Sequence, residues 1–126
     1  MQKVIAIDFD GTIVENDWPN VGPVIPGALE VIELLHLHGH KLILNTCRVD
    51  GTLKIAEDFL KAQDMHHCFL CVNVNDPELI LHYGVDCRKI SADIYIDDRA
   101  IGIPTKDGLV DWFSILRLMK QQHIIP

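Results

Sequence analysis

Residues 4–12 read Val-Ile-Ala-Ile-Asp-Phe-Asp-Gly-Thr, an apolar run that ends in acidic and small residues. A continuous apolar run bounded by a glycine turn is typical of a short strand buried in a parallel sheet. Gly11 allows the backbone to turn, so that Asp8 and Asp10 can approach one point just past the strand. The stretch therefore predicts a strand over residues 3–9, followed at once by a polar loop.

Strand and helix signals alternate along the rest of the chain. Apolar runs predict three more strands, at residues 41–45, 69–73 and 94–96. Apolar residues at helical spacing, with proline and glycine near the ends, predict four helices, at residues 26–39, 51–60, 77–82 and 109–119. This alternation indicates a layered α/β sandwich around a parallel sheet.

The composition limits the classes of function. A length of 126 residues with 48% hydrophobic content predicts one domain, residues 1–126, with one sizeable core. A net charge of −7 argues against a nucleic-acid groove or an anionic membrane surface as the partner. The sequence carries no recognisable leader or membrane-spanning run, so we expect a cytoplasmic protein with its four cysteines reduced.

Three polar clusters directly follow predicted strands. They are residues 8–12, residues 46–48 and the pair Asp97-Asp98. Ligands of open parallel sheets bind at the carboxyl ends of the strands. We therefore expect the three clusters to meet at one edge of the sheet.

Carboxylates gathered in this way need a cation. Bringing Asp8, Asp10 and Asp97 together without one would raise at least one pKa substantially. Donor sets made only of oxygen favour magnesium over zinc. The acidic cluster thus predicts a Mg²⁺ site.

With the ion bound, the same residues suit phosphoryl transfer. Asp8 would attack phosphorus, and Asp10 would give a proton to the leaving oxygen and later recover one from water. Thr46 could hold phosphoryl oxygens through its hydroxyl, and Lys89 could offset the charge that develops in the transition state. Arg48, two residues past Thr46, could grip a substrate anion or be a solvated loop charge.

The order of these residues resembles the four motifs of the haloacid dehalogenase-like phosphatases. The matching positions are residues 8–12, Thr46, Lys89 and residues 96–98, so the resemblance spans residues 4–98. It implies a Rossmann-like three-layer fold and an aspartyl-phosphate intermediate on Asp8. It also implies magnesium held by Asp8, Asp97 and the Asp10 carbonyl, with Asp98 in an outer shell.

The resemblance further implies a phosphatase without a cap domain. Residues 13–26 leave room only for a short flap, and residues 47–88 are occupied by predicted core elements. An open site of this kind would accept a phosphorylated small molecule or a macromolecular phosphate ester, and a second subunit of a homo-oligomer could shield it. Lys54 is an alternative to Lys89 as the third motif. Transfer to an acceptor other than water, and a non-catalytic binding or assembly module, are the alternative functions.

A second group of metal-binding residue types lies at 66–71. His66, His67, Cys68 and Cys71 offer zinc-type donors, but the spacing lacks a distant second pair of ligands. We therefore expect structural thiols and surface histidines here.

Overall fold

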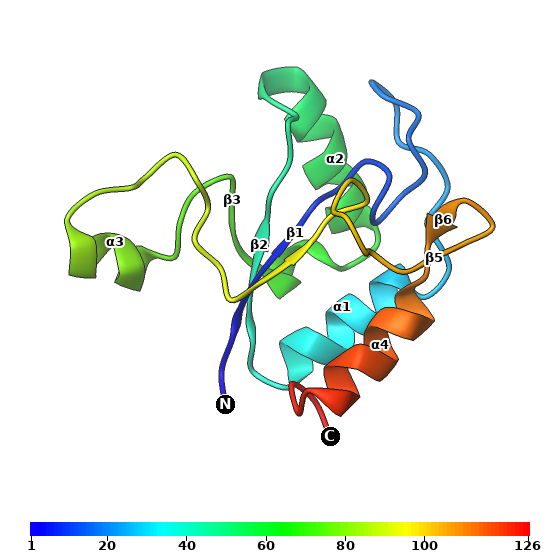
Figure 1. The fold of residues 1–126 in the computed structure, drawn as a ribbon. Coiled ribbons are helices and arrows are strands. Elements are labelled where there is room, and N and C mark those ends of the chain that lie inside the picture. Colours follow the sequence, from blue (N-terminus) through cyan, green and yellow to red (C-terminus); the bar gives the residue numbers. More distant parts are fainter.

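The computed structural model describes residues 1–126 and contains a four-stranded parallel sheet with helices on either side (Figure 1). The strands are β1 (Val4–Ile7), β2 (Lys41–Leu44), β3 (Phe69–Val72) and β4 (Ile94–Ile96). Their order is β3-β2-β1-β4, which makes β1 an inner strand between β2 and β4. The predicted α/β fold with a parallel sheet is confirmed, and the carboxyl end of β1 lies beside those of both neighbours.

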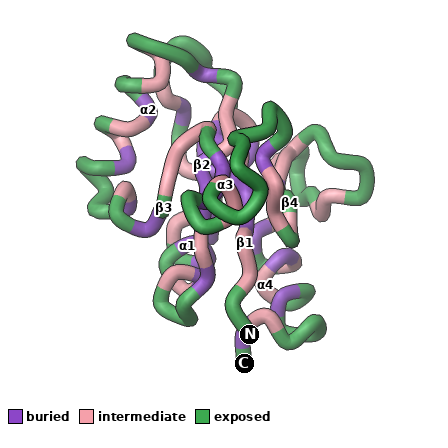
Figure 2. Tube along the Cα trace, turned by 90° about the vertical axis from the view of Figure 1, so that its left-hand side faces the viewer, coloured by how far each residue is buried: buried purple, intermediate pink, exposed green.

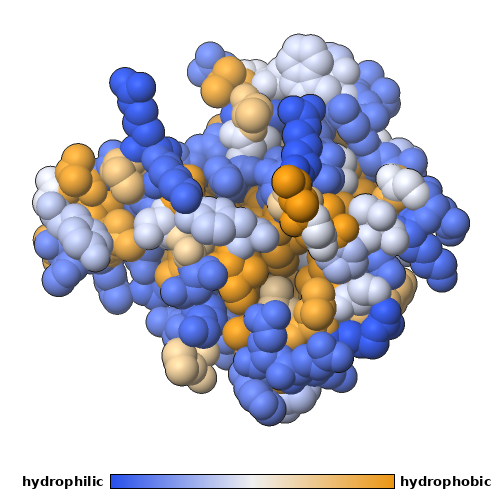
Figure 3. Space-filling view, in the orientation of Figure 1, coloured by the Kyte–Doolittle hydropathy of each residue, from blue (hydrophilic) through white to orange (hydrophobic).

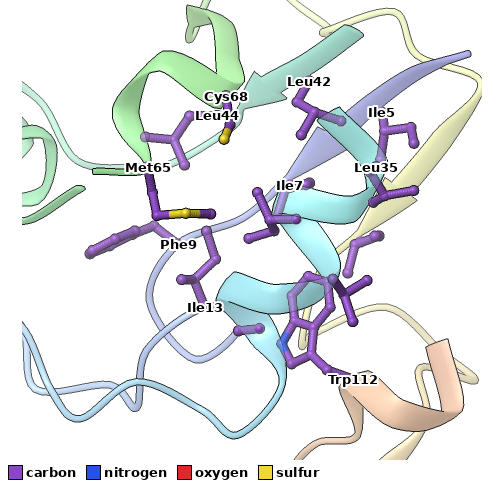
Figure 4. Packing of buried hydrophobic residues seen from close by; sticks show 14 of the residues in the cluster. Ile5, Ile7, Phe9, Ile13, Leu35, Leu42, Leu44, Met65, Cys68 and Trp112 are labelled. Carbon is purple, nitrogen blue, oxygen red and sulfur yellow. The ribbon is translucent and has the colours of Figure 1, made fainter. Parts of the chain in front are cut away.

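One face of the sheet is thickly covered. Helices α1 (Ala28–Leu37), α2 (Asp50–Ala62) and α4 (Trp112–Gln121) contribute to a single cluster of 23 buried residues together with β1 and β2. Figure 4 shows Phe9, Ile13 and Trp112 within this cluster, close to the loop that follows β1. The helices thus hold the base of the polar loops in a packed core.

The other face is thinly covered. Helix α3 (Pro77–Tyr83) contains no buried residue, and the core on this side consists of Ala6, Ile43 and Ile90. Figure 2 shows α3 lying in front of the strands with α1 and α4 behind them. The three layers of the sandwich are therefore unequal.

The region before the last helix differs from the sequence-based prediction. A helix was expected over residues 109–119, but α4 begins at Trp112, where the Asp111 side chain accepts a hydrogen bond from the Ser114 amide at 3.2 Å. Strands β5 (Thr105–Lys106) and β6 (Leu109–Val110) form an antiparallel hairpin instead. Asp107 and Gly108 both have positive φ at its tip, and Asp-Gly is a common two-residue hairpin turn.

Two further segments connect the helices and strands. Residues 13–26 form a flap between β1 and α1, in which Val14 bridges both Asp10 and Val24. The 3₁₀ turn η1 (His66–Cys68) joins α2 to β3. None of the helices has the length and apolar character that a membrane crossing requires.

Candidate active site

Thr12 connects the ends of β1 and β4. Its hydroxyl donates to Asp8 Oδ2 at 2.9 Å and accepts from the Asp98 amide at 3.0 Å. Its carbonyl accepts a hydrogen bond of 2.7 Å from the indole Nε1 of Trp112 on α4. Thr12 is fully buried, so the packed face of the sheet fixes the loop that carries Asp8.

Gly11 allows the closest approach between the two loops. Its φ is +82°, a conformation that residues with a side chain rarely adopt. A Cβ atom at this position would also overlap the carboxylate of Asp98. Both conditions require glycine between Asp10 and Thr12.

Three carboxylates gather where β1 and β4 end. Asp8, Asp97 and Asp98 each offer an oxygen atom, and these atoms all lie within 4.8 Å of one another. Burial raises the pKa of Asp8 to about 7, against the opposing effect of the Thr12 hydrogen bond, and Asp97 and Asp98 add to the rise. The full set of negative charges is therefore unfavourable without a compensating cation, and an all-carboxylate donor set fits a magnesium ion.

The three predicted clusters do meet at one cavity, of about 230 Å³. Its walls include five residues predicted from the sequence, Asp8, Asp10, Thr46, Asp97 and Asp98. Asp98, expected in an outer shell, contributes an oxygen to the same group as Asp8 and Asp97. The remaining residues of the wall are Asn16, Trp18, Cys47 and Arg99.

Arg48 serves neither of the purposes expected of it. Its side chain is 1% exposed, so it is not a solvated loop charge. Nε and one terminal nitrogen donate to the two carboxylate oxygens of Asp10 at 2.7 and 2.8 Å. The other three N–H groups donate to the carbonyls of Pro19, Asn20 and Thr52 at 2.9, 2.6 and 3.0 Å.

Arginine has five N–H donors, and each of them has a partner inside the protein. Arg48 therefore has no donor left for a substrate, and its expected role as a substrate ligand is corrected. It joins Asp10 to the flap and to the first turn of α2. The Phe9 ring, 5.3 Å from the guanidinium carbon, lies against the same group.

Asn73 holds the loop that follows β2. Its side-chain oxygen accepts from the Thr46 amide at 2.8 Å, and its nitrogen donates to the Arg48 carbonyl at 3.3 Å. The Thr46 hydroxyl in turn accepts from the Arg48 amide at 3.1 Å. Asn73 was assigned to a strand, but its φ of +55° places it just past β3, and asparagine is among the residues that tolerate this conformation best.

The structure does not bring Lys89 into the cavity. Lys89 is exposed, and its ammonium lies over the ring of Tyr95, 5.5 Å from the centroid. Its backbone is held by the Asn75 side chain, which donates to the Lys89 carbonyl at 3.4 Å. The alternative, Lys54, lies on an exposed face of α2 and pairs with Asp58 at 2.6 Å. Neither lysine lines the cavity.

Two residues at the mouth of the cavity were not predicted as site residues. Trp18, in the flap, is 61% exposed and lines the cavity. Arg99 is the basic side chain in the cavity wall, and no acidic partner holds its guanidinium. Its position directly after the Asp97-Asp98 pair could have indicated from the sequence that it lies at the site.

The chain is similar to one protein of solved structure, described as a conserved protein coded by a locus from Bacteroides thetaiotaomicron. The two are 38% identical and superpose with a TM-score of 0.81, over 97% of this chain and 93% of the other. No model of a known protein family matches the chain. No curated protein matches it either.

Proposed function

This chain belongs to the same family as the conserved Bacteroides thetaiotaomicron protein, and we propose that it is a magnesium-dependent phosphomonoester hydrolase that reacts through Asp8. The observation that carries the proposal is the meeting of Asp8, Asp97 and Asp98 in one cavity with Asp10 and Thr46. The order of these residues, which resembles that of the haloacid dehalogenase-like phosphatases, adds support.

Asp8, Asp97 and Asp98, with the Asp10 carbonyl, are the groups that would hold the magnesium ion. When bound, the ion would neutralise the carboxylates and draw charge from the phosphoryl oxygens. Asp8 would then stay ionised at neutral pH, because a neighbouring cation offsets the burial that raises its pKa to about 7.

The reaction needs a nucleophile and a proton carrier. An Asp8 carboxylate oxygen forms a bond to phosphorus while the bond to the leaving alcohol breaks, and Asp10 supplies the proton that this alcohol takes. Water then attacks the aspartyl phosphate, returns a proton to Asp10 and frees Asp8. Each Asp10 oxygen accepts one hydrogen bond from Arg48, so each keeps a second lone pair for this exchange.

Thr46 and Arg99 are the groups available to orient the phosphoryl oxygens. The Thr46 hydroxyl is held by the Arg48 amide and keeps its own proton for donation. We assign to Arg99 the role expected of Lys89, which is to offset the charge that develops in the transition state. Arg99 lines the cavity, and no carboxylate side chain engages it. We expect its guanidinium to contact the phosphate or another anionic group of the substrate.

The open cavity sets the substrate class. The protein would act in the cytoplasm on a phosphorylated small molecule or on a phosphate ester of a macromolecule. The flap that carries Trp18 is the cover that the chain itself offers, and a second subunit of a homo-oligomer could complete it.

The test compares the native chain with Asp8→Asn and with Asp17→Asn, an exposed flap acid outside the cavity wall. Phosphate release would be measured with para-nitrophenyl phosphate, metabolite phosphates and a phosphopeptide, with and without Mg²⁺. We expect Mg²⁺-dependent turnover that falls at least about a thousand-fold in Asp8→Asn and stays in Asp17→Asn.

Two outcomes would favour the other functions. Transfer of phosphate to added glycerol, without a matching release of inorganic phosphate, would indicate a phosphotransferase. Absence of turnover with every substrate in a folded native protein that binds Mg²⁺ would contradict the hydrolase proposal and favour a binding module.

A further inference from the structure

Three metal-binding side chains meet at a place outside the acidic cavity. His36 lies in the last turn of α1, and His67 and Cys68 lie in η1. One ring nitrogen from each histidine and the Cys68 sulfur all lie within 4.8 Å of one another. None of the three residues belongs to the cavity wall described above. Helix α1 thus supplies one distant ligand, where the local spacing of residues 66–71 lacked a distant pair.

We propose that His36, His67 and Cys68 form a second metal site, which binds a divalent transition metal of the zinc class. Imidazole nitrogen and thiolate sulfur are the donors that zinc prefers, whereas the carboxylates of the first site suit magnesium. The two sites would therefore select different ions by their chemistry.

The geometry of the cluster fits such an ion. With metal bonds of about 2.0–2.3 Å, neighbouring ligand atoms of a tetrahedral site lie about 3.3–3.7 Å apart. Cys68 Sγ lies 3.8 Å from His67 Nε2, so a small closing movement would satisfy both bonds. The two imidazole rings meet edge to face, with centroids 5.4 Å apart and an interplanar angle of 83°.

The surroundings favour a cation. The Asp64 carboxylate lies 3.7 Å from Nδ1 of His67, on the opposite side of the ring from the sulfur. A carboxylate near the second nitrogen is a common way to orient a metal-bound histidine. Glu33, one turn before His36 on α1, also places its negative charge near the Cys68 thiol. Glu33 or a water molecule could fill the fourth position.

The consequence of binding would be structural. The Cys68 thiol loses its proton to solvent as the sulfur binds the metal, and the ion then joins the end of α1 to η1. Because η1 leads directly into β3, the ion would hold an edge strand of the sheet from the packed side.

Cobalt(II) is a suitable probe, because its absorption reports both tetrahedral geometry and thiolate ligation. The metal-free full-length protein would be titrated with Co²⁺, and then with Zn²⁺ in competition. The variants are His36→Gln, His67→Gln and Cys68→Ser. The controls are His66→Gln and Cys71→Ser, which alter neighbouring donors outside the cluster, and Asp8→Asn, which alters the acidic site.

We expect one equivalent of Co²⁺ with a thiolate charge-transfer band, displaced by Zn²⁺, in the native chain and all three controls. His36→Gln and His67→Gln should weaken binding at least about tenfold, and Cys68→Ser should lose the band. His36 and His67 are not buried, so these two variants keep the test valid if Cys68→Ser fails to fold. Absence of stoichiometric binding, equal binding by the histidine variants, or loss of binding in Asp8→Asn would overturn the proposal.

Discussion

The two faces of the sheet hold the loops at its edge in different ways. On the packed face, Trp112 reaches from α4 to the Thr12 carbonyl, and Thr12 fixes Asp8 and Asp98. On the thin face, α3 has no buried residue, and hydrophobic residues reach the surface on the left of Figure 3, where this helix lies. Lys89 follows α3 and is exposed. Asp8 and Asp98, which the packed face supports, lie in the cavity as the order of the motifs predicts. Lys89, which follows the thin face, lies outside it.

The largest expected effect is loss of the support from α4. Trp112 is fully buried, so Trp112→Ala should lower the free energy of unfolding by about 3–5 kcal/mol, as cavity-forming substitutions do. Leu81→Ala on α3 should change it by less than about 0.5 kcal/mol, because Leu81 is 86% exposed. Urea denaturation measures both. Equal losses would show that the two faces contribute alike.

Loss of the Arg48 hydrogen bonds should have the second largest effect. Arg48→Met leaves the Asp10 carboxylate and three carbonyls without their donors, so we expect a loss of about 3–5 kcal/mol of stability together with loss of the proposed phosphatase activity. Arg48→Lys should not rescue it, because an ammonium cannot reproduce the planar fork.

Matched controls for Arg48 come from the two other basic residues near the site. Arg99→Met should raise KM with little change in the urea midpoint, because Arg99 is exposed. Lys89→Ala should leave kcat within about twofold, in keeping with its position over Tyr95. A large loss of kcat in Lys89→Ala would mean that the thin face closes onto the site during turnover.

The contact between the β1 and β4 loops gives a smaller effect. Gly11→Ala combines an unfavourable positive φ with overlap on Asp98, so it should cost about 1–3 kcal/mol and weaken Mg²⁺ binding. Gly39→Ala is the control, because Gly39 has the same kind of φ, +84°, with no atom within 4 Å of the added Cβ. Similar Mg²⁺ affinities in the two variants would argue against a role for the close approach.

The pH dependence of stability tests the burial of Asp8 on the packed side of this contact. The pKa of Asp8 rises from 3.8 to about 7 in the folded chain, so between these values the folded state binds more protons than the unfolded state. The contribution of Asp8 to stability is therefore greatest below about pH 4 and is lost as the pH rises toward 7. Urea midpoints of the metal-free protein should show this decline, and Asp8→Asn should flatten it. If the urea midpoint of Asp8→Asn declined with pH by the same amount, the decline would have to come from other titrating groups.

Much of the fold was predictable because its strands are continuous apolar runs. Residues 4–7, 41–44 and 94–96 are all recognisable in this way, and parallel strands place the polar residues after them at one edge. The meeting of Asp8, Thr46 and Asp97 follows from topology alone. The hairpin before α4 was missed although Asp107-Gly108 is a recognised turn signal, because Leu109 continued the apolar spacing of the helix.

The rest depended on contacts that local sequence does not encode. The role of Arg48 is set by the carbonyls of Pro19 and Asn20, which belong to a flap without periodic pattern. Asn73 acts through a hydrogen bond to a loop beyond the neighbouring strand. The meeting of His36 with η1 results from helix packing, so no spacing rule within residues 66–71 could reveal it.

The weak burial of α3 has a consequence for how the molecule opens. Native proteins unfold locally where few apolar contacts must be broken, and such segments exchange amide protons and admit proteases first. The side chain of Asp76 caps α3 and binds Lys41 at 2.7 Å. The buried Asn75 side chain donates to Asp86, Cys87 and Lys89, in the segment that follows α3. The segment between Asp76 and Asp86 can therefore open while Asn75 keeps its partners, so this chain should be nicked within residues 77–85 long before its acidic cavity is disturbed.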